Sequence, residues 1–366
     1  MNKSFEKIDF TLFTAVFAAV LLGLLTVYSS SAVFAYEEFG DGAHYFKRQI
    51  MWALLGAVGA VFLFKLGPEK MRRYALPMLV MSVILLFAVH VPGFGRKAGG
   101  AVRWLKMGPF SFQPFEFVKF FYVFYLAAVL SADKQGIIKK GGQIILMTLL
   151  VSVGLILQRD FGGMAIITML LLVMLFVSGI PIYVFGGLAA AAAGVFAFLI
   201  KIEPYRLKRV LSFLNPWDDY YGAGWQTIQS LIAIGSGGPL GVGFTQSQQK
   251  FYYLPAPHTD YIYSIIGEEW GLIGALAVLA VFYVILQRGV YIALHTEDRF
   301  LKFTAYGMTF MIVVQALINM FVAAGLLPPK GTTLPFLSSG GSSLIVNLAA
   351  IALLLSISRK LKGDRA

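Results

Sequence analysis

The sequence predicts an all-α polytopic membrane protein with about ten transmembrane helices in a single domain, residues 1–366. Hydrophobic residues make up 58% of the chain and charged residues only 13%, and the mean hydropathy is +0.76. This composition is far more apolar than that of a typical water-soluble domain. Apolar stretches of about 20 residues, the length that spans a hydrocarbon core, recur along the whole chain. No stretch is left over for a soluble domain.

The predicted helices fall on ten apolar windows, whose edges are defined to within a few residues. They are residues 11–34, 49–66, 74–91, 114–131, 143–158, 161–179, 182–200, 262–286, 303–325 and 343–358. The first window is long enough to span, so we expect a retained anchor and not a cleavable signal peptide. Residues 158–162 predict a tight polar hairpin between the fifth and sixth helices. Two long loops remain, at 92–113 and at about 201–261.

An even number of spans places both termini on one side of the membrane, and basic clusters beside helix ends mark the cytoplasmic side. Such clusters occur at 70–73, 139–140 and 359–362, whereas the first loop on the other side carries Glu37, Glu38 and Asp41. We therefore expect both termini in the cytoplasm. The large loop between helices 7 and 8, about 201–261, is then extracytoplasmic.

The charge balance and the lack of cysteine exclude several classes of site. The chain has no Cys, so it has no disulfide, thiolate nucleophile or Cys-based metal site. The net charge of +12 is scattered between apolar spans and forms no stripe on a soluble face, so nucleic acid is not an expected partner. An anionic lipid or a lipid-linked anionic substrate suits this charge better.

Two charged residues lie inside the fourth predicted span. Lys119 is about one turn from its end, where an ionisable group is costly and usually marks a site or a pathway. Glu116 precedes it by three residues on the same helix face, so the two are expected to pair. Snorkelling of a flanking lysine is the alternative interpretation.

The densest polar stretch, residues 250–261, leads into the eighth helix. Asp260 at the helix mouth either caps the helix as an N-cap or acts as a general base at the edge of low dielectric, with His258 two residues away. Lys250 at the start of this stretch is a candidate for substrate binding. Glu268 and Glu269 lie about two turns deeper, so at least one of them must face the interior of the bundle.

Two further loop features are expected on the same face. One carries Arg103 and Trp104, and the other is the Ser/Gly run 338–343, in which Ser338 and Gly340 are candidate ligand contacts. The run can cap the tenth helix and lets a ligand approach closely. Cations, a carboxylate and a helix N-terminus on one face suit a bound pyrophosphate.

Five stretches, in order and spacing, resemble motifs of the SEDS family of bacterial cell-wall proteins, which includes FtsW, RodA and SpoVE. They are GAVRWLKMGPFSFQPFEFVK (100–119), QRDFG (158–162), NPWDDYYGAGWQTIQSLIAIGSGG (215–238), HTDYIYSIIGEE (258–269) and GLLPPKGTTLPFLSSGGSS (325–343). Gly267-Glu268-Glu269 and the run 329–335 are more similar to the FtsW/SpoVE branch than to the RodA branch. Arg159 and Ser339 depart from the family, which usually has proline and tyrosine at these positions.

The resemblance implies a peptidoglycan glycosyltransferase that polymerises lipid II at the outer face of the bacterial cytoplasmic membrane. Asp260 matches the essential aspartate of the family, and Arg103-Trp104 match its Arg-Trp motif. Glu116 and Lys119 match its paired charges, and Arg48 matches the arginine of an Arg-Gln pair at the start of the second helix. Undecaprenyl pyrophosphate would be the leaving group.

The resemblance also implies partners. These are lipid II and nascent glycan, a class B penicillin-binding protein that crosslinks the strands, and other membrane proteins of the divisome or elongasome. A divalent cation, Mg²⁺ or Mn²⁺, is compatible with the chemistry, and Asp260 is a candidate ligand for it. A lipid II flippase and a non-catalytic scaffold for division or elongation remain alternative functions.

Overall fold

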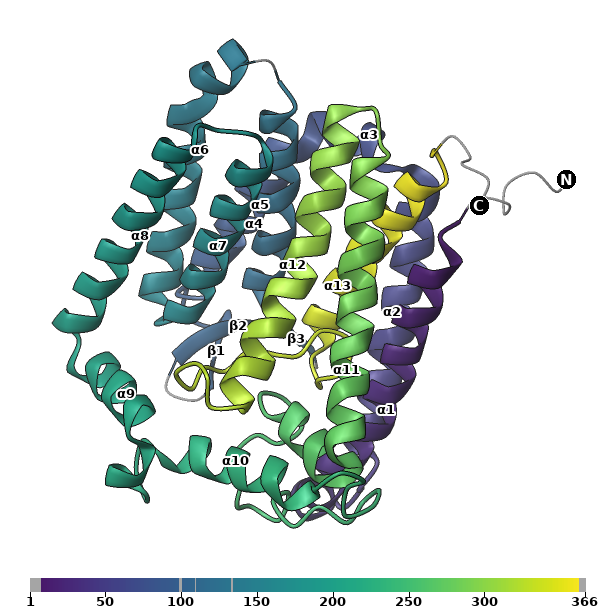
Figure 1. Cartoon of the computed structure of the whole chain (residues 1–366), viewed down its shortest axis with the longest axis vertical. Coiled ribbons are helices and arrows are strands. Elements are labelled where there is room, and N and C mark those ends of the chain that lie inside the picture. The colour runs from purple at the N-terminus through teal and green to yellow at the C-terminus, as the bar shows by residue number, and fades with distance from the viewer. Residues whose placement is uncertain (1–7, 99–100, 109, 133, 362–366) are drawn as a thin grey trace, which may run out of the picture.

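The computed structural model describes residues 8–98, 101–108, 110–132 and 134–361 and consists mainly of long helices that run side by side (Figure 1). Gly100 and Pro109 of the first motif and Lys362 of the C-terminal basic cluster lie outside the described residues. The long helices are α1 (Phe10–Phe39), α2 (His44–Leu66), α4 (Ala75–Ala88), α5 (Pro114–Leu130), α6 (Lys134–Leu157), α7 (Phe161–Val177), α8 (Ile182–Ile202), α11 (Ile262–Leu294), α12 (Arg299–Ala323) and α13 (Gly341–Ser358).

Each of the ten predicted windows coincides with one of these helices. In the described part of the chain, eight helices are long and apolar enough to cross a membrane when α4 is counted with α3 (Pro68–Met71) and the 3-10 turn η1 (Arg72–Tyr74) that precede it. The two others, α5 and α7, have 17 residues each. The chain is therefore a multi-pass, helical membrane protein, as the hydropathy predicts.

The centre of the bundle is formed by α5, α12 and α13, whose residues are mostly buried. No residue of α8 is buried, and α8 stands at the edge of the bundle beside α7 (Figure 1). A helix that is apolar all round and unburied in the protein suits a lipid-facing position. The bundle is thus organised around α5 and α12.

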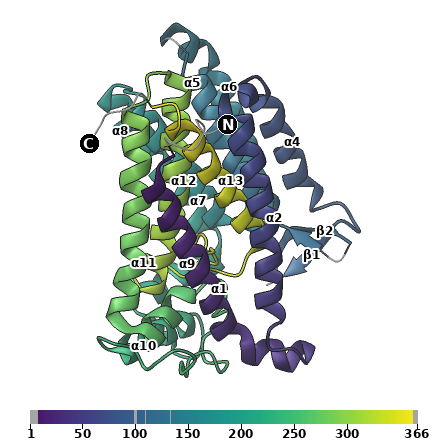
Figure 2. The same ribbon diagram turned by 90° about the vertical axis from the view of Figure 1, so that its right-hand side faces the viewer.

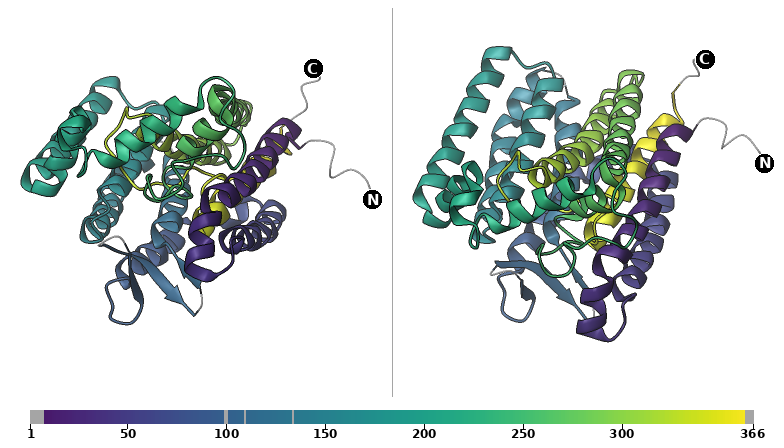
Figure 3. Two further views of the ribbon diagram at one scale, coloured as in Figure 1. Left: turned by 90° about the horizontal axis from the view of Figure 1, so that it is seen from below. Right: turned by 60° about the horizontal axis from the view of Figure 1, so that its bottom comes forward.

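The two ends of the bundle differ. The described chain begins and ends at one end, where α3 also lies, and α9 (Pro204–Leu214) and α10 (Trp225–Gly237) lie at the other (Figures 1 and 2). Seen from that second end, α10 and the segment after it cross the face of the bundle (Figure 3). The predicted loop 201–261 is therefore largely folded, since it also contains the 3-10 turn η2 (Pro216–Asp219).

The described residues of the predicted loop 92–113 also contain regular structure. They form a three-stranded antiparallel sheet of β1 (Gly95–Ala98), β2 (Ala101–Met107) and β3 (Phe110–Phe112), in the order β1-β2-β3. The sheet projects from the side of the bundle near the end that carries α9 and α10 (Figures 1 and 2). These strands were not predicted from the sequence, because the polar residues of this segment indicate a loop between two spans. The helical prediction holds for the spans themselves.

Helix α11 is kinked near its start, at Gly271. Gly271 has φ 65° and ψ −159°, a conformation that glycine adopts readily. The segment after α10 fits against the kink, because the backbone N–H groups of Val242 and Gly243 donate to the carbonyls of Glu268 and Glu269 at 2.9 and 3.1 Å. The first two turns of α11 are thereby held against α10.

Candidate functional site

Asp260 lies at the end of the bundle that carries α9 and α10, directly before α11. The N-cap of α11 is Tyr261, and no side chain caps this helix, so the interpretation of Asp260 as a capping side chain is wrong. The backbone of Asp260 is held on both sides: its N–H donates to Ala256 O at 3.2 Å, and its carbonyl accepts from Asn319 Nδ2 at 2.8 Å. The backbone groups of Asp260 are therefore used within the fold, and its carboxylate does not cap α11.

The loop 324–340 holds the segment around Asp260 in place. Ser338 Oγ donates to the carbonyl of Thr259 at 2.5 Å and accepts from the N–H of Leu334 at 2.8 Å. Asn319 donates from the same amide nitrogen to the carbonyl of Thr332. The hydroxyl of Ser338, a predicted site residue, thus binds the backbone of the residue before Asp260 and holds it in position.

Arg103 reaches the site through an irregularity in the sheet. The register of β1 and β2 changes between Arg96 and Lys97, which pair with Trp104 and Val102, so that Arg103 has no partner residue in β1. Bulges of this kind re-aim a side chain. Arg103 Nε donates to the carbonyl of Gln158 at 3.3 Å, and its Nη2 donates to that of Arg159.

The backbone of Arg159 accounts for one departure from the family pattern. Its φ is 54°, an angle that the ring of a proline cannot adopt. The turn between α6 and α7 therefore has a shape here that a prolyl residue would exclude. The second departure, Ser339, contributes only its N–H, which donates to the carbonyl of His258 at 2.9 Å.

Lys330 is the site residue that the sequence analysis missed. Its Nζ is buried and has no hydrogen-bond partner among the residues that the structure describes. The side chain runs over Gly162, where even a Cβ atom would overlap it. Asp160 caps α7 by accepting from the N–H of Gly163 at 2.9 Å. Among the acidic residues, Asp160 raises the pKa of Lys330 most. The only indication of this residue in the sequence was that the family-like motif 325–343 contains a lysine.

Burial and neighbouring charges shift the pKa values of both Asp260 and Lys330. Burial raises the pKa of Asp260 from 3.8 to about 6, although the positive charges of Arg103, Lys330 and Arg209 oppose the rise. Burial likewise lowers the pKa of Lys330 from 10.5 to about 8, against the carboxylate of Asp160. A carboxylate that titrates near 6 beside three cations is typical of a functional site.

Glu116 and Lys119 pair as predicted, at 2.8 Å. Lys119 is fully buried and also donates to Gln315 Oε1, and Gln315 Nε2 donates to the carbonyl of Thr333 at 2.9 Å. The pair therefore supports the loop that carries Lys330. The structure places Lys119 behind this loop, among protein partners.

Lys250 also has protein partners. Its Nζ is 3.0 Å from Glu269 Oε1, with both side chains buried, and it donates to the carbonyl of Thr245 at 2.6 Å. Glu268 and Glu269 are both buried, which confirms that this pair faces the interior. Glu268 Oε1 accepts from the N–H of Gln248 at 2.9 Å, so the two glutamates anchor the loop 245–250.

Three of the remaining predicted residues, His258, Arg48 and Gly340, lie near the start of α2 or of α13, and the fourth, Trp104, lies in β2. Burial lowers the pKa of His258 to about 4, and its ring lies 4.7 Å from that of Tyr45, so His258 is neutral at pH 7. Arg48 is half-buried in α2, and its guanidinium makes no hydrogen bond or ion pair with another described residue. Gly340 precedes α13, and its N–H donates to Gln49 Oε1 at 3.3 Å. Trp104 is half-buried in β2.

A cleft of about 290 Å³ lies beside α9 at the same end of the bundle. Arg209, Trp225 and Pro329 are among the residues that line it. Arg209 Nη1 donates to the carbonyl of Pro329 at 3.2 Å, directly before Lys330. The cleft thus lies beside α9, and Arg209 in its wall is one of the cations whose charge acts on Asp260.

Comparison with known proteins identifies the family. The profile of the FtsW/RodA/SpoVE family, described as "Cell cycle protein", matches residues 10–363. The chain belongs to the FtsW/RodA/SpoVE family. Within this family it is 40% identical over 357 residues to "Probable peptidoglycan glycosyltransferase FtsW" of Trichlorobacter lovleyi, covering 97% of this chain and 94% of that protein. It is 41% identical over 341 residues to "Stage V sporulation protein E" of Bacillus subtilis, covering 92% and 93%. These names agree with the predicted FtsW/SpoVE branch.

Solved structures of the FtsW/RodA/SpoVE family share the fold. The crystal structure of the rod shape determining protein RodA of Thermus thermophilus superposes with a TM-score of 0.72 at 28% identity, covering 99% of this chain and 100% of that one. A second chain, at a TM-score of 0.79 and 32% identity, covers 98% and 99% and comes from work on "structural coordination of polymerization and crosslinking by a peptidoglycan synthase complex". The RodA-like fold therefore extends over the whole chain.

Proposed function

We propose that this chain is a peptidoglycan glycosyltransferase that polymerises lipid II into β-1,4 glycan strands at the outer face of the bacterial cytoplasmic membrane. One observation carries the proposal: Asp260, with a pKa raised to about 6 by burial, lies within reach of the charges of Arg103, Lys330 and Arg209 at one end of a membrane bundle. An acid that titrates there is suited to general base catalysis near neutral pH. The name of the related FtsW protein and the fold shared with RodA support this assignment.

In the proposed reaction Asp260 accepts the proton of the acceptor's sugar 4-hydroxyl. The oxygen then attacks the anomeric carbon of the donor, and the bond from that carbon to the diphosphate oxygen breaks. One displacement turns an α-linked donor into a β-linked product, so a single base and no covalent intermediate suffice. The electron pair of the broken bond leaves with undecaprenyl pyrophosphate.

The cationic side of the site stabilises the leaving group. The charges of Arg103 in β2 and of Lys330 in the loop 324–340 act on Asp260, and fixed cations are most effective where charge develops in the transition state. Arg48, which is half-buried at the start of α2, is proposed as a further cation for the diphosphate. Lys119, held by Glu116 and Gln315, positions the loop of Lys330.

A divalent cation fits this site only as a companion of the substrate's diphosphate. Within residues 8–98, 101–108, 110–132 and 134–361, no three His, Asp or Glu side chains converge as metal ligands. The cations around Asp260 also disfavour a metal held by that carboxylate alone. Mg²⁺ commonly binds through substrate phosphates together with one or two carboxylates, and no step proposed here passes through it.

The two ends of the bundle support the orientation. Basic residues at 70–73, 139–140 and 359–360 lie at the end where the described chain begins and ends (Figure 1), which is typical of the cytoplasmic side. Asp260 and the segment 203–261 are then outside, where the sugars of lipid II meet water while the polyprenyl tails stay in lipid.

We further propose that the chain works with a class B penicillin-binding protein and with other membrane proteins of the divisome or elongasome. Glycan strands need crosslinking, which requires a transpeptidase. The related chain of known structure comes from work on a peptidoglycan synthase complex that couples polymerization and crosslinking, which supports such a partnership.

The direct test supplies purified protein with lipid II and Mg²⁺ and measures glycan strands by gel electrophoresis. The wild type should make strands, and Asp260→Asn should lose them while remaining folded. Normal polymer from Asp260→Asn would remove this carboxylate from the mechanism. A parallel liposome assay with fluorescent lipid II separates the alternatives: translocation without polymer would indicate a flippase, and neither activity would indicate a scaffold.

A further inference from the structure

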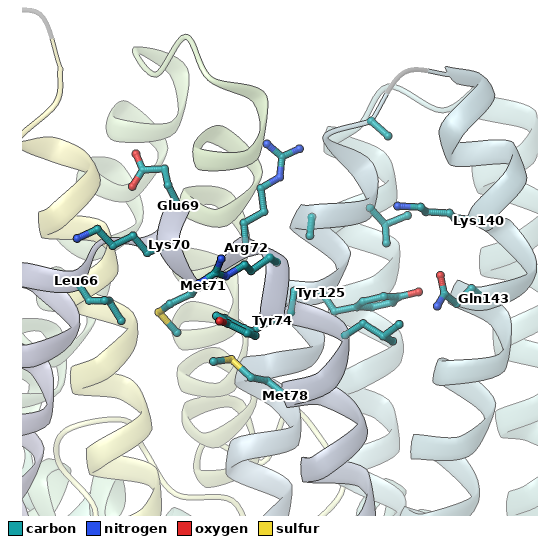
Figure 4. Close-up of a pocket in the computed structure, with 16 residues that line it drawn as sticks. Leu66, Glu69, Lys70, Met71, Arg72, Tyr74, Met78, Tyr125, Lys140 and Gln143 are labelled. Carbon is teal, nitrogen blue, oxygen red and sulfur yellow. The ribbon is translucent and has the colours of Figure 1, made fainter.

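Two cavities at opposite ends of the bundle differ in how their lining residues are arranged. The larger, of about 990 Å³, lies among α3, η1, α4, α5 and α6 (Figure 4). Its Lys70 points away from Tyr125, and Lys140 comes from a separate helix (Figure 4), so these polar groups do not share one ligand. The smaller cleft beside α9, of about 290 Å³, has lining residues that contact one another.

Aromatic residues from two elements line the cleft beside α9. Tyr205 and Arg209 lie on one face of α9, four residues apart, and the guanidinium of Arg209 lies 4.9 Å from the centroid of the Tyr205 ring. Tyr221 and Trp225, just before and at the start of α10, also line the cleft, and their rings stack with centroids 6.1 Å apart. Trp225 is held in place because its Nε1 donates to the carbonyl of Tyr253 at 2.8 Å.

The two cations in the cleft lining already have partners within the protein. Lys208 is paired with Asp219 at 3.1 Å. Arg209 donates to the carbonyl of Pro329 at 3.2 Å and lies over the ring of Tyr205. A cleft whose cations are engaged and whose other walls are aromatic favours a neutral ligand over a phosphate or a carboxylate.

One polar side chain in the cleft is available to a ligand. Gln226, in the first turn of α10, is half-buried, and its amide makes no hydrogen bond with another described residue. An amide offers both donors and an acceptor, which suit the hydroxyl and acetamido groups of an N-acetylated sugar, and aromatic rings pack against the C–H face of a sugar ring. The volume is at the small end of the range for small-molecule sites, about 300–1,000 Å³, so it suits one sugar ring.

The segments that form the cleft also carry the catalytic groups. Pro255 and Pro329 line it. Pro255 precedes Asp260 by five residues, and Pro329 directly precedes Lys330. The charge of Arg209 acts on the carboxylate of Asp260 and lowers its pKa. The cleft therefore lies on the outer end of the bundle, where α9 and α10 lie (Figure 1), in the region that a glycan strand leaving Asp260 has to cross.

We propose that this cleft binds one N-acetylhexosamine unit of the nascent glycan strand and keeps the strand on the protein between successive additions. Tyr205 and Tyr221 pack against the sugar ring, and the amide of Gln226 binds its polar groups. A unit that carries a stem peptide is too large for this volume, so the bound unit is one without a peptide. The inference rests on the proposed polymerase function and adds a second contact region for its product.

The test variant is Tyr205→Ala with Tyr221→Ala. These side chains are 62% and 89% exposed, so their removal should cost the fold little. The control is Trp217→Ala with Phe251→Ala, which removes two exposed aromatic side chains at the same end of the bundle but outside the cleft lining. A further variant, Gln226→Leu, keeps the aromatic rings and removes only the amide.

The first measurement is the length of the glycan strands on gels, compared at equal consumption of lipid II. The test variant should make strands about fivefold shorter or more, because one aromatic contact corresponds to roughly fivefold in affinity. Gln226→Leu should shorten the strands by about threefold, as expected for one lost hydrogen bond. The control should make strands of the same length as the wild type.

The second measurement needs no catalytic activity. Chitotetraose, a soluble oligomer of N-acetylglucosamine, is added to the full chain in detergent micelles, and saturation-transfer NMR detects its acetamido methyl groups. The wild type and the control should give equal signals, and the test variant should lose about fivefold or more of this signal. Inorganic pyrophosphate, added as a competitor, should not displace the sugar.

Several outcomes would overturn the proposal. Equal strand lengths or equal chitotetraose signals in the test variant and the control would show that the cleft holds no sugar. Displacement of chitotetraose by pyrophosphate would assign the cleft to the anionic part of the substrate. If the test variant unfolds at a lower temperature than the control, Gln226→Leu decides. A wild type that makes no polymer would contradict the proposed function instead, and chitotetraose binding would still decide whether the cleft takes a sugar.

Discussion

The side chain of Lys330 runs directly over Gly162, so that a Cβ atom at position 162 would overlap Lys330 Cδ and Cε. These residues are 168 positions apart in the sequence. The contact joins the first turn of α7 to the loop before α13. It explains why position 162 carries glycine: any larger side chain would displace the lysine from its observed path.

The substitution Gly162→Ala should therefore lower activity in the same way as a substitution of Lys330 itself. The added methyl group forces the lysine side chain to move, and we expect polymerisation of lipid II to fall by about tenfold or more, as for the loss of one preorganised electrostatic contact. Gly142→Ala in α6 is the control, because a Cβ atom there meets nothing within 4 Å. Equal activity of the two variants would show that the position of Lys330 is unimportant.

The pH profile separates the two titrating groups. Asp260 acts as a base only when ionised, and its pKa is about 6, so kcat/KM should fall as the pH drops below 6. Lys330 stabilises the leaving group only when protonated, and its pKa is about 8, so kcat/KM should also fall as the pH rises above 8. The expected profile is a bell between these two values.

Variants at position 330 test that assignment. Lys330→Arg keeps the positive charge at all accessible pH values and should abolish the alkaline limb. Lys330→Met should lower turnover by about 100-fold and move the acid limb to higher pH, because the charge of Lys330 lowers the pKa of Asp260. An alkaline limb that persists in Lys330→Arg would assign it to another group.

The sequence predicted the spans and one side-chain pair because both depend on local spacing. Apolar windows of helical length locate every long helix, and the three-residue interval of Glu116 and Lys119 brings them together on one face. Lys330 could not be predicted, because its environment comes from Gly162 and Asp160 on a distant turn. For the same reason the bulge at Arg103 was not foreseen: it depends on the pairing of β1 with β2.

Asp260→Asn should be inactive and at least as stable as the wild type near neutral pH. The folded protein raises the pKa of this acid from 3.8 to about 6, so the folded state binds more protons than the unfolded state between these values. Stability is then lost as the pH rises through 6, by up to about 3 kcal/mol. The asparagine variant lacks this loss.

Thermal unfolding at pH 5 and pH 7.5 measures this difference. The wild type should gain stability relative to Asp260→Asn as the pH falls from 7.5 to 5. An asparagine variant that unfolds more readily than the wild type at pH 7.5 would mean that the ionised carboxylate stabilises the fold, and its inactivity would then no longer identify a base.

Lys250 was predicted to bind substrate, and its ion pair with Glu269 gives a different expectation. Both side chains are buried, 3.0 Å apart, so Lys250→Met leaves the charge of Glu269 without its partner and should lower the free energy of unfolding by about 3 kcal/mol. The double variant Lys250→Met with Glu269→Gln removes both charges and should recover much of this loss. Urea unfolding of the two single variants and the double variant measures the coupling. A role in substrate binding would instead raise KM for lipid II in Lys250→Met with unchanged stability, and the double variant would not restore it.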